Sequence, residues 1–450
     1  MRRILVPTVL AAALFAGEAV PPQAAEPFRD GTREITVTSA KDMSLSPKAD
    51  PDGLKHYELW YQGFDGAKWG AWQKHSQVYP KGTPVVWAPP EGRWQIHLRV
   101  VLTSDLASAD PAKNPEAVKP HKEFIIDRSA PQVAVNFPTA KAKLRGGDKY
   151  TVTWTAADPY LRNTPIAVKW SLDGSGTFST VADNLPNSGS FEWTVPRDMT
   201  QSGVLRVESA DKSGNVGLAE ATGLLVDSIR PKGRVTGPAI SAKSETALEL
   251  EIADTGPAGL TAARLWVSQD DGTSWTEGPT IEAPFKSVTW KAPQDGKFRL
   301  YVVATDGAGN VSTAPQGKVG EVLAVDTAAP TVLLAAAIGI SESTTAGPAS
   351  RRDFKPTDRV QVVFTAKDAN LVANSVSVSW QADAGKPWVE LGKGLPTDQA
   401  FRFQIPADAK DSKSARIKVS AADAAGNVGE VVAAESFTIQ ATIGTIELAP

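Results

Sequence analysis

The sequence of 450 residues contains no cysteine. The protein therefore forms no disulfide, has no thiolate zinc site or cysteine nucleophile, and lacks the cysteine of a lipoprotein anchor. A chain that folds without disulfides depends on its hydrophobic cores. Domains of about 100 residues are large enough to supply such cores.

An excess of charge of one sign is also lacking. The chain has 47 basic and 50 acidic residues, and its formal net charge is −3. Positive and negative residues are interspersed, so the sequence has no basic stripe that would suit nucleic acid or an anionic lipid surface. We expect no nucleic-acid partner.

Long apolar runs are confined to the N terminus. Arg2 and Arg3 precede an apolar run over residues 4–16, and small residues at Gly17, Ala19 and Ala24 or Ala25 offer cleavage sites. This pattern is typical of a secretory signal peptide, and the run is too short to span a bilayer. We predict a signal peptide over residues 1–25 and a mature protein that is secreted, periplasmic or at the cell surface, with no membrane span. Export without cysteine favours a bacterial source.

Histidine is scarce. The four histidines, His56, His75, His97 and His121, all lie in the first 121 residues. No G-x-S-x-G, H-E-x-x-H or P-loop motif occurs, so the sequence predicts that the protein is not an enzyme. A surface metal site on these histidines lacks a carboxylate at a fixed spacing and is disfavoured.

What the chain does contain is a repeat. The phrases "ADKSGNVG", "TDGAGNVS" and "ADAAGNVG" occupy residues 210–217, 305–312 and 422–429. Each is preceded by an alternating strand that ends in aspartate, a strand with tryptophan, and an aromatic residue three positions before proline. The linkers "IDRSAP", "VDSIRP" and "VDTAAP" separate the copies.

The spacing of these landmarks predicts four domains, because a period of about 100–115 residues exceeds that of solenoid or propeller repeats. The predicted domains cover residues 26–126, 127–226, 227–325 and 326–440, followed by a tail over 441–450. The first domain replaces the Gly-Asn hairpin with "TSDLASADPAKNPEAVKPHKEF". The fourth domain carries an insertion near its start.

Within each copy the hydrophobic pattern alternates with period two, as in "RWQIHLRVVL". This alternation predicts half-buried strands, and turn signals every 8–12 residues favour an antiparallel β-sandwich. The repeated phrase is expected to close a tight hairpin in which Gly and Asn tolerate positive φ. The fold class is all-β.

Tandem units joined by V-D-x-x-x-P and carrying A-D-x-x-G-N-V resemble the bacterial Ig-like or fibronectin-III-like repeats of exported and cell-surface proteins. The resemblance implies four tandem Ig-like antiparallel β-sandwich domains in an elongated array. It is specific for fold and weak for function, because this sandwich hosts many roles.

Thirteen tryptophans suggest carbohydrate binding, but most of them recur at matching positions and are expected in the cores. Tyr61, Trp72 and Tyr79 of the first domain have no equivalents. They form either an exposed aromatic face for a glycan or protein partner, or cross-strand pairs on a hairpin. "SQDDGTSW" (268–275) fits an Asp-box, which we interpret as a turn rather than as part of a propeller.

Recurring aspartates give the most specific hypothesis. In an Ig-type sandwich the loop after the second strand and the last hairpin lie at the end where the chain enters. Three carboxylates should therefore converge at each joint between domains, and carboxylate oxygens are the ligands that calcium prefers. Alternatively, each aspartate caps its own turn. The predicted groups are Asp127, Asp158 and Asp211; Asp227, Asp254 and Asp306; and Asp326, Asp368 and Asp423.

The sequence thus predicts an exported, non-catalytic structural, adhesive or binding protein that spaces or presents a binding surface to a protein or glycan. No cofactor other than calcium is implied. The alternative is a carbohydrate-binding or enzymatic first domain followed by three Ig-like spacers.

Overall fold

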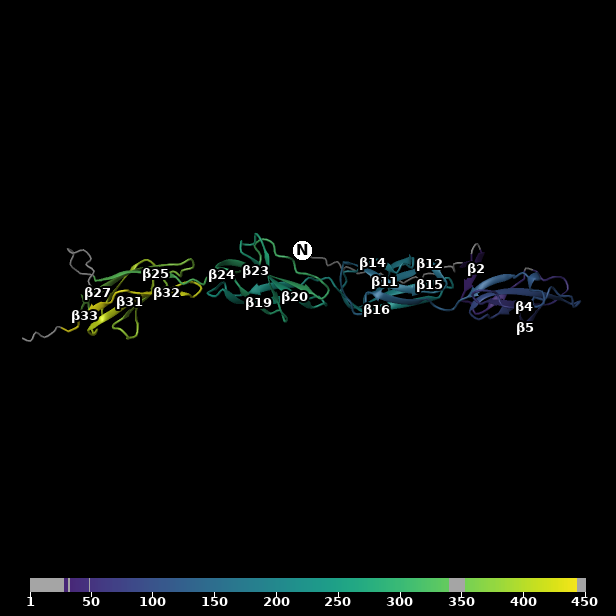
Figure 1. Ribbon diagram of the computed structural model, residues 1–450, viewed down its shortest axis with the longest axis horizontal. Helices are drawn as coiled ribbons and strands as arrows, with labels where there is room; N and C mark the ends of the chain where they lie inside the picture. The colour runs from purple at the N-terminus through teal and green to yellow at the C-terminus, as the bar shows by residue number, and fades with distance from the viewer. Residues whose placement is uncertain (1–27, 31–32, 48, 340–352, 443–450) are drawn as a thin grey trace, which may run out of the picture. The chain divides into compact units, whose positions relative to one another are not determined.

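The computed structural model describes residues 28–30, 33–47, 49–339 and 353–442 (Figure 1). The predicted signal peptide, most of the predicted tail and part of the insertion in the fourth repeat lie outside these residues. Apart from one three-residue 3-10 helix, η1 (Pro115–Ala117), the regular structure of the described residues consists of β-strands. The all-β prediction is confirmed. No helix in the described part of the chain has the length and apolar character needed to cross a membrane.

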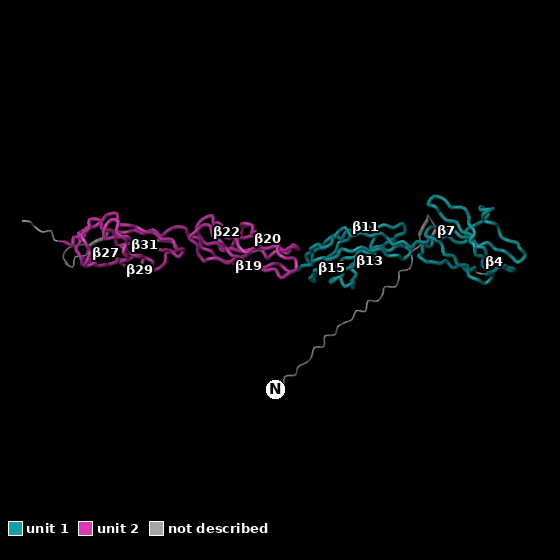
Figure 2. Tube along the Cα trace, turned by 90° about the horizontal axis from the view of Figure 1, so that it is seen from below, with its two compact units in different colours: residues 1–228 teal, residues 229–450 magenta. Residues whose placement is uncertain are grey.

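The chain forms two compact units, residues 1–228 and residues 229–450 (Figure 2). The described residues contain four large hydrophobic cores, two in each unit, and each core lies within a separate set of sheets. Tandem β-sandwiches are therefore the architecture of this chain.

The first set of sheets in unit 1 belongs to the first repeat. It has one six-stranded sheet of order β1-β2-β8-β7-β4-β5 and a two-stranded sheet, β3-β6. Leu59, Ile96 and Phe124 are fully buried between them. The strands are β1 (Phe28–Asp30), β2 (Arg33–Thr38), β3 (Met43–Leu45), β4 (Leu54–Phe64), β5 (Gln73–Pro80), β6 (Val85–Trp87), β7 (Gly92–Leu102) and β8 (Lys122–Ile126).

The second set in unit 1 is a sandwich of a three-stranded sheet, β14-β11-β9, and a five-stranded sheet, β10-β16-β15-β12-β13. Val152, Val168 and Leu205 fill the space between the sheets. The strands are β9 (Gln132–Phe137), β10 (Lys143–Arg145), β11 (Lys149–Ala157), β12 (Leu161–Ser171), β13 (Ser179–Leu185), β14 (Ser190–Thr194), β15 (Thr200–Asp211) and β16 (Val216–Asp227).

Unit 2 repeats this arrangement twice. Its first sandwich joins β17-β19-β22 to β18-β24-β23-β20-β21, and its second joins β25-β27-β30 to β26-β33-β31-β28-β29, with β32 paired to β31. The first sandwich contains β17 (Lys232–Thr236), β18 (Ile240–Ser241), β19 (Glu245–Ala253), β20 (Leu260–Ser268), β21 (Thr276–Ile281), β22 (Ser287–Lys291), β23 (Gly296–Asp306) and β24 (Glu321–Val325). The second contains β25 (Thr331–Gly339), β26 (Asp353–Phe354), β27 (Arg359–Lys367), β28 (Val376–Gln381), β29 (Val389–Leu395), β30 (Ala400–Gln404), β31 (Ser412–Ala422), β32 (Val428–Val432) and β33 (Phe437–Ile439).

Each repeat also contains one parallel strand pair within its otherwise antiparallel sheets. The pairs are β2 with β8, β10 with β16, β18 with β24, and β26 with β33. In the last three repeats the first strand pairs in the three-stranded sheet and the next short strand joins the other sheet. This second strand therefore runs alongside the last strand of the repeat, in the same direction.

The recurring aromatic positions are core positions only in part. The aromatics that precede proline are all buried, namely Trp87, Trp193, Trp290 and Phe403. Trp170 and Trp380 are also core residues. The expectation is wrong for Trp266, and Trp60 is buried but in a separate cluster on the other side of its sheet. One residue of difference in register places a strand side chain on the opposite face of the sheet.

Trp266 is half-buried between the core residues Leu265 and Val267, and therefore faces away from the core. Trp60 likewise lies between core residue Leu59 and Tyr61, which packs against the same core. Trp60 is nevertheless only 7% exposed, since it contacts Trp72 and Val118 on the outer side of the sheet.

Of the two alternatives for the unmatched aromatics of the first repeat, the exposed face is wrong for two of the three residues. Trp72 is 8% exposed and Tyr79 is 2% exposed. Tyr61 is half-buried, and its ring stacks on Trp87 at 4.6 Å between centroids. The segment that replaces the Gly-Asn hairpin, residues 103–121, is the physical reason for the burial of Trp72, because Val118 of this segment packs against it.

The same segment also bonds to the part of β7 that extends beyond its pairing with β8. The backbone N–H of Leu98 donates to His121 Nδ1 at 2.9 Å, and that of Val100 donates to Ser108 Oγ at 3.0 Å. The His97 and His121 rings stack at 4.3 Å between centroids. His97 Nδ1 also lies 3.0 Å from the Lys119 carbonyl oxygen, so these two side chains hold the segment against the sheet.

Candidate metal centres

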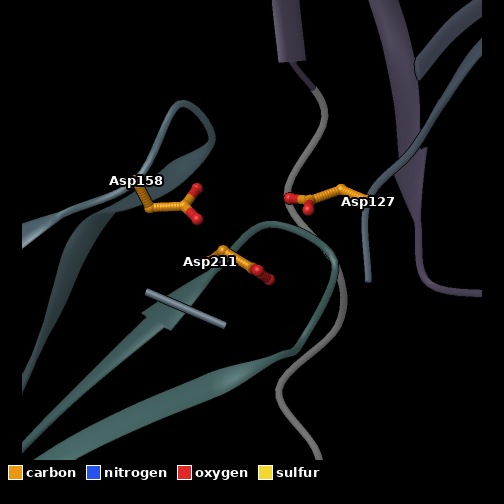
Figure 3. A group of neighbouring side chains, drawn as sticks. All are labelled: Asp127, Asp158 and Asp211. Carbon is orange, nitrogen blue, oxygen red and sulfur yellow. The ribbon is translucent and has the colours of Figure 1, made fainter. Parts of the chain in front are cut away.

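The first predicted aspartate group comes together in unit 1. Asp127 follows β8, Asp158 follows β11, and Asp211 ends β15. One carboxylate oxygen from each of the three lies within 4.8 Å of the others, and Figure 3 shows the carboxylates turned toward a common space. We call these residues, together with Asn215, the Asp127 joint.

The third predicted group comes together in unit 2. Asp326 follows β24, Asp368 follows β27, and Asp423 follows β31. Their carboxylate oxygens meet the same limit of 4.8 Å. We call these residues, together with Asn427, the Asp326 joint.

The remaining predicted group takes Asp227 from unit 1 and Asp254 and Asp306 from unit 2. Asp227 ends β16, Asp254 follows β19, and Asp306 ends β23. Because the group draws on both units, its assembly stays a prediction from the repeat.

The repeated phrase forms one turn in all three copies. In the first copy the Asn215 N–H donates to Asp211 Oδ1 at 2.9 Å, and the Asn215 side-chain amide donates to Asp211 Oδ2 at 2.8 Å. Asp306 with Asn310 and Asp423 with Asn427 make the same pair of bonds at 2.7–2.8 Å. Gly214 adopts φ +89°, which explains the glycine, whereas the expected positive φ at Asn is wrong.

The asparagine side chain bonds to the linker as well as to its own turn. Asn215 Nδ2 also donates to the backbone carbonyl of Asp127 at 3.0 Å and to that of Ser129 at 3.2 Å. Asn427 Nδ2 makes the same contacts with the carbonyls of Asp326, at 2.7 Å, and Ala328, at 3.3 Å. This asparagine latch fastens the last hairpin of a repeat to the linker that enters it, and sequence reasoning missed it.

The backbone carbonyl of the linker proline lies close to the residue two positions after the latch asparagine. A Cβ on Gly217 would lie 1.8 Å from the carbonyl oxygen of Pro131, and one on Gly429 would lie 1.7 Å from that of Pro330. In the remaining copy the equivalent residue is Ser312, whose hydroxyl donates to the Pro231 carbonyl at 2.9 Å. The contact with the linker therefore explains which residue type ends the repeated phrase.

The carboxylates of the Asp127 joint repel one another in a poorly hydrated space. Burial is the main cause that raises the pKa of Asp127, to about 6, and the negative charges of Asp211, Asp158 and Glu91 raise it further. Burial, followed by the charge of Asp211, also raises the pKa of Asp158. These shifts indicate a local excess of negative charge.

One oxygen of Asp127 lacks a hydrogen bond. Asp127 is 6% exposed, and its Oδ1 accepts a bond from the Ser129 N–H at 3.2 Å. Its Oδ2 is buried and has no hydrogen-bond partner among the described residues. A buried, unpartnered carboxylate oxygen is costly and requires a physical explanation.

Asp326 differs at this atom. Its Oδ1 accepts a bond from the Ala328 N–H at 3.2 Å, but its Oδ2 accepts one from Asn370 Nδ2 at 2.6 Å. The backbone N–H of Asn370 donates to Asp368 Oδ1 at 2.7 Å. Asn370 therefore ties two of the three carboxylates together.

Tyr160 occupies the position of Asn370 in the Asp127 joint. Its N–H donates to Asp158 Oδ1 at 2.6 Å, which matches the bond from Asn370 to Asp368. Its side chain, however, packs against Ile35, Val37 and Ile125 of the first repeat. A tyrosine that turns to this apolar cluster supplies no amide to Asp127.

The structure shows both the convergence of the carboxylates and the capping of turns that the sequence predicted as alternatives. Asp158 and Asp211 cap turns through the bonds just described, yet the carboxylates also converge. A donor set made only of carboxylates suits a hard cation such as calcium, and lacks the imidazole or thiolate that zinc favours.

Comparison with known families agrees with the observed sheets. Residues 137–218 match the model of the Kre9/KNH-like N-terminal Ig-like domain. The match covers strands β10 to β15 and the first copy of the repeated phrase. No curated protein sequence matches the chain.

Solved structures of tandem Ig-like and fibronectin-III-like proteins are similar to the chain at low identity. The fibronectin(III)-like modules of Clostridium thermocellum CbhA have 17% identity and a TM-score of 0.27, and the alignment covers 43% of this chain and 93% of theirs. A 1.5-MDa bacterial ice-binding adhesin has 16% identity and a TM-score of 0.32, covering 70% and 100%. The FN1–FN3 domains of chicken CNTN1 have 13% identity and a TM-score of 0.27, covering 64% and 96%.

These TM-scores are below 0.5, so the assignment of the fold rests on the sheet topology and on the Ig-like match. The chain is built from tandem Ig-like or fibronectin-III-like sandwiches.

Proposed function

We propose that the chain is an exported, non-catalytic protein whose Ig-like domains are held at set positions by their joints, so that it spaces or presents a binding surface. The partner is a protein or a glycan at the cell surface. The observation that carries this proposal is the asparagine latch. Independent domains on a flexible tether would not need hydrogen bonds between a hairpin and the linker.

Several contacts of the Asp127 joint restrain the linker together. Asn215 donates to two linker carbonyls, Gly217 packs on Pro131, and Tyr160 packs on the apolar cluster of the preceding repeat. Linkers without such contacts behave as flexible chains. A short linker with both hydrogen bonds and apolar packing favours a preferred geometry between its two domains.

The pattern of the aspartates also favours a structural role over a catalytic one. Asp211, Asp306 and Asp423 each accept both hydrogen bonds from the asparagine of their own turn. The same constellation recurs in three copies, as expected of a building element, whereas a catalytic site is needed once.

The latch is tested by single-molecule energy transfer across the Asp127 joint in the full chain. Because the sequence has no cysteine, Lys81→Cys and Thr177→Cys introduce two unique labelling sites at exposed positions. Asn215→Ala removes the amide that bonds to Asp127, Ser129 and Asp211, which costs about 2 kcal/mol. We expect this variant to broaden the distribution of transfer efficiencies.

Asn427→Ala is the matched control, since it removes the same latch from the Asp326 joint and leaves the labelled pair untouched. It should preserve the narrow distribution. An unlatched Asn215→Ala variant with the same width as the parent would show that the joint does not set the geometry, and would overturn the proposal.

A further inference from the structure

The two joints that lie within single units present the same three carboxylates but satisfy them differently. In the Asp326 joint a side-chain amide reaches the buried oxygen of Asp326. In the Asp127 joint the equivalent oxygen, Asp127 Oδ2, is buried and has no hydrogen-bond partner among the described residues. A group that is 94% buried and negatively charged is stable only if something else compensates it.

We propose that Asp127, Asp158 and Asp211 bind one calcium ion, and that in the Asp326 joint the amide of Asn370 takes over the role of that ion. The inference does not depend on what the protein presents, because it concerns only the chemistry of the joints.

The donor atoms of the Asp127 joint fit a hard divalent cation. Three carboxylates supply at least three of the six to eight oxygen ligands that calcium takes, and water completes the shell. Their oxygens lie within 4.8 Å of one another, and three oxygens at this limit lie about 2.8 Å from their common centre. A shift of a few tenths of an ångström brings all three to the calcium–oxygen distance of about 2.4 Å. Magnesium demands a smaller octahedral shell and gives up water reluctantly, so the site favours calcium.

The hydrogen bonds already present do not prevent Asp158 and Asp211 from binding a cation. Asp211 accepts two bonds from Asn215, and Asp158 accepts one from the Tyr160 N–H. A carboxylate has about four lone-pair positions, so these bonds orient the two side chains without exhausting their oxygens. The turn contacts therefore act as supporting hydrogen bonds for the ligands.

In the Asp326 joint the amide does part of the work of a cation. Asn370 Nδ2 lies 2.6 Å from Asp326 Oδ2, and the Asn370 N–H lies 2.7 Å from Asp368 Oδ1. Two donors from one residue thus bridge two carboxylates, as an ion would. A cation therefore gains less binding free energy at the Asp326 joint than at the Asp127 joint.

Isothermal titration of the full chain, freed of metal with EDTA and dialysed, tests both halves of the proposal. Calcium chloride is the probe and magnesium chloride is the comparison. Asp127→Asn preserves the shape of the side chain and removes one charge, and Asp326→Asn is the matched variant in the other joint. We expect Asp127→Asn to lose one bound calcium per chain, or to weaken it at least tenfold, and Asp326→Asn to keep the parental number.

The outcomes are distinct. Calcium binding by Asp127→Asn that equals the parent's, or a parent that binds no calcium at millimolar concentration, overturns the site. If Asp326→Asn loses a calcium of the same affinity, Asn370 does not replace the ion. A circular dichroism spectrum of each variant confirms that it is folded, and the energy-transfer width measured in EDTA separates this result from the test of the asparagine latch.

Discussion

The Asp127 and Asp326 joints use the same repeated phrase, the same aspartates and the same asparagine latch, but differ in one loop residue. Tyr160 of the first joint turns to an apolar cluster, whereas Asn370 of the second turns to a carboxylate. The Asp127 joint therefore combines apolar contact with unbalanced negative charge, and the Asp326 joint balances its charge with an amide. In the proposal made above, this one side chain decides whether a joint needs a cation.

The close contact between glycine and the linker proline is common to the two joints, so the same substitution should destabilise both equally. A methyl group on Gly217 or Gly429 would lie under 2 Å from a linker carbonyl, so Gly217→Ala and Gly429→Ala should each lower the free energy of unfolding of their own sandwich by about 3 kcal/mol. Thermal unfolding of the full chain, followed by calorimetry, measures the two losses.

Ser312→Ala is the control, because a Cβ is already tolerated there and the change removes only the bond to the Pro231 carbonyl. It should cost about 1 kcal/mol. Equal losses for all three variants would mean that the close approach to the linker does not matter.

The charge of the Asp127 joint should show in the pH dependence without calcium. Burial and the carboxylates of Asp211, Asp158 and Glu91 raise the folded-state pKa of Asp127 from its ordinary 3.8 to about 6. Between these two pKa values, Asp127 holds a proton in the folded protein that it has released in the unfolded chain. In EDTA, stability should therefore fall by about 2 kcal/mol as the pH rises from 4 to 6, and stay low above pH 6.

Asp127→Asn should remove this fall, and saturating calcium should offset it at pH 7. The neighbouring Tyr160 phenol stays neutral throughout this range, because burial and nearby negative charge raise its pKa. Denaturant unfolding of the parent and the variant at a series of pH values measures the difference, and parallel curves would contradict the prediction.

The smallest expected effect comes from making the second joint resemble the first. Asn370→Ala removes the amide from Asp326 Oδ2 and should cost about 1 kcal/mol in EDTA. Calcium should then stabilise the Asp326 joint, as it does the Asp127 joint. Melting temperatures with and without calcium measure this, with Val372→Ala, an exposed position of the same loop, as a control. A variant that stays insensitive to calcium would break the comparison.

The repeat made much of this predictable from the sequence. Strand alternation predicted the all-β class. The aspartates that recur after a strand, in the repeated phrase and in the linker predicted the members of the Asp127 and Asp326 joints. These positions follow from local patterns, because the loops concerned lie at the same end of every sandwich. The co-occurrence of Asn with the linker was a signal for the latch, but its acceptors lie nearly 90 residues away in sequence.

Register and loop packing were less predictable. Trp60 and Trp266 were expected in the main cores because they recur at matching positions, but loops of different length and an irregular pairing between Leu260 and Ala262 move the register. The burial of Trp72 depends on the segment over residues 103–121, whose path is set by contacts with the β7 edge. The distinction between Tyr160 and Asn370 likewise depends on what each side chain meets across the joint.

The parallel pairing of the short early strand with the last strand of each repeat has a mechanical consequence. In β10 and β16, for example, Lys143, Leu144 and Arg145 align with Leu225, Val226 and Asp227 in the same direction. Tension applied through the two linkers of this repeat pulls these strands past each other along their length. Their hydrogen bonds are then loaded together in shear instead of being opened one after another, which is the geometry by which a sheet resists stretching.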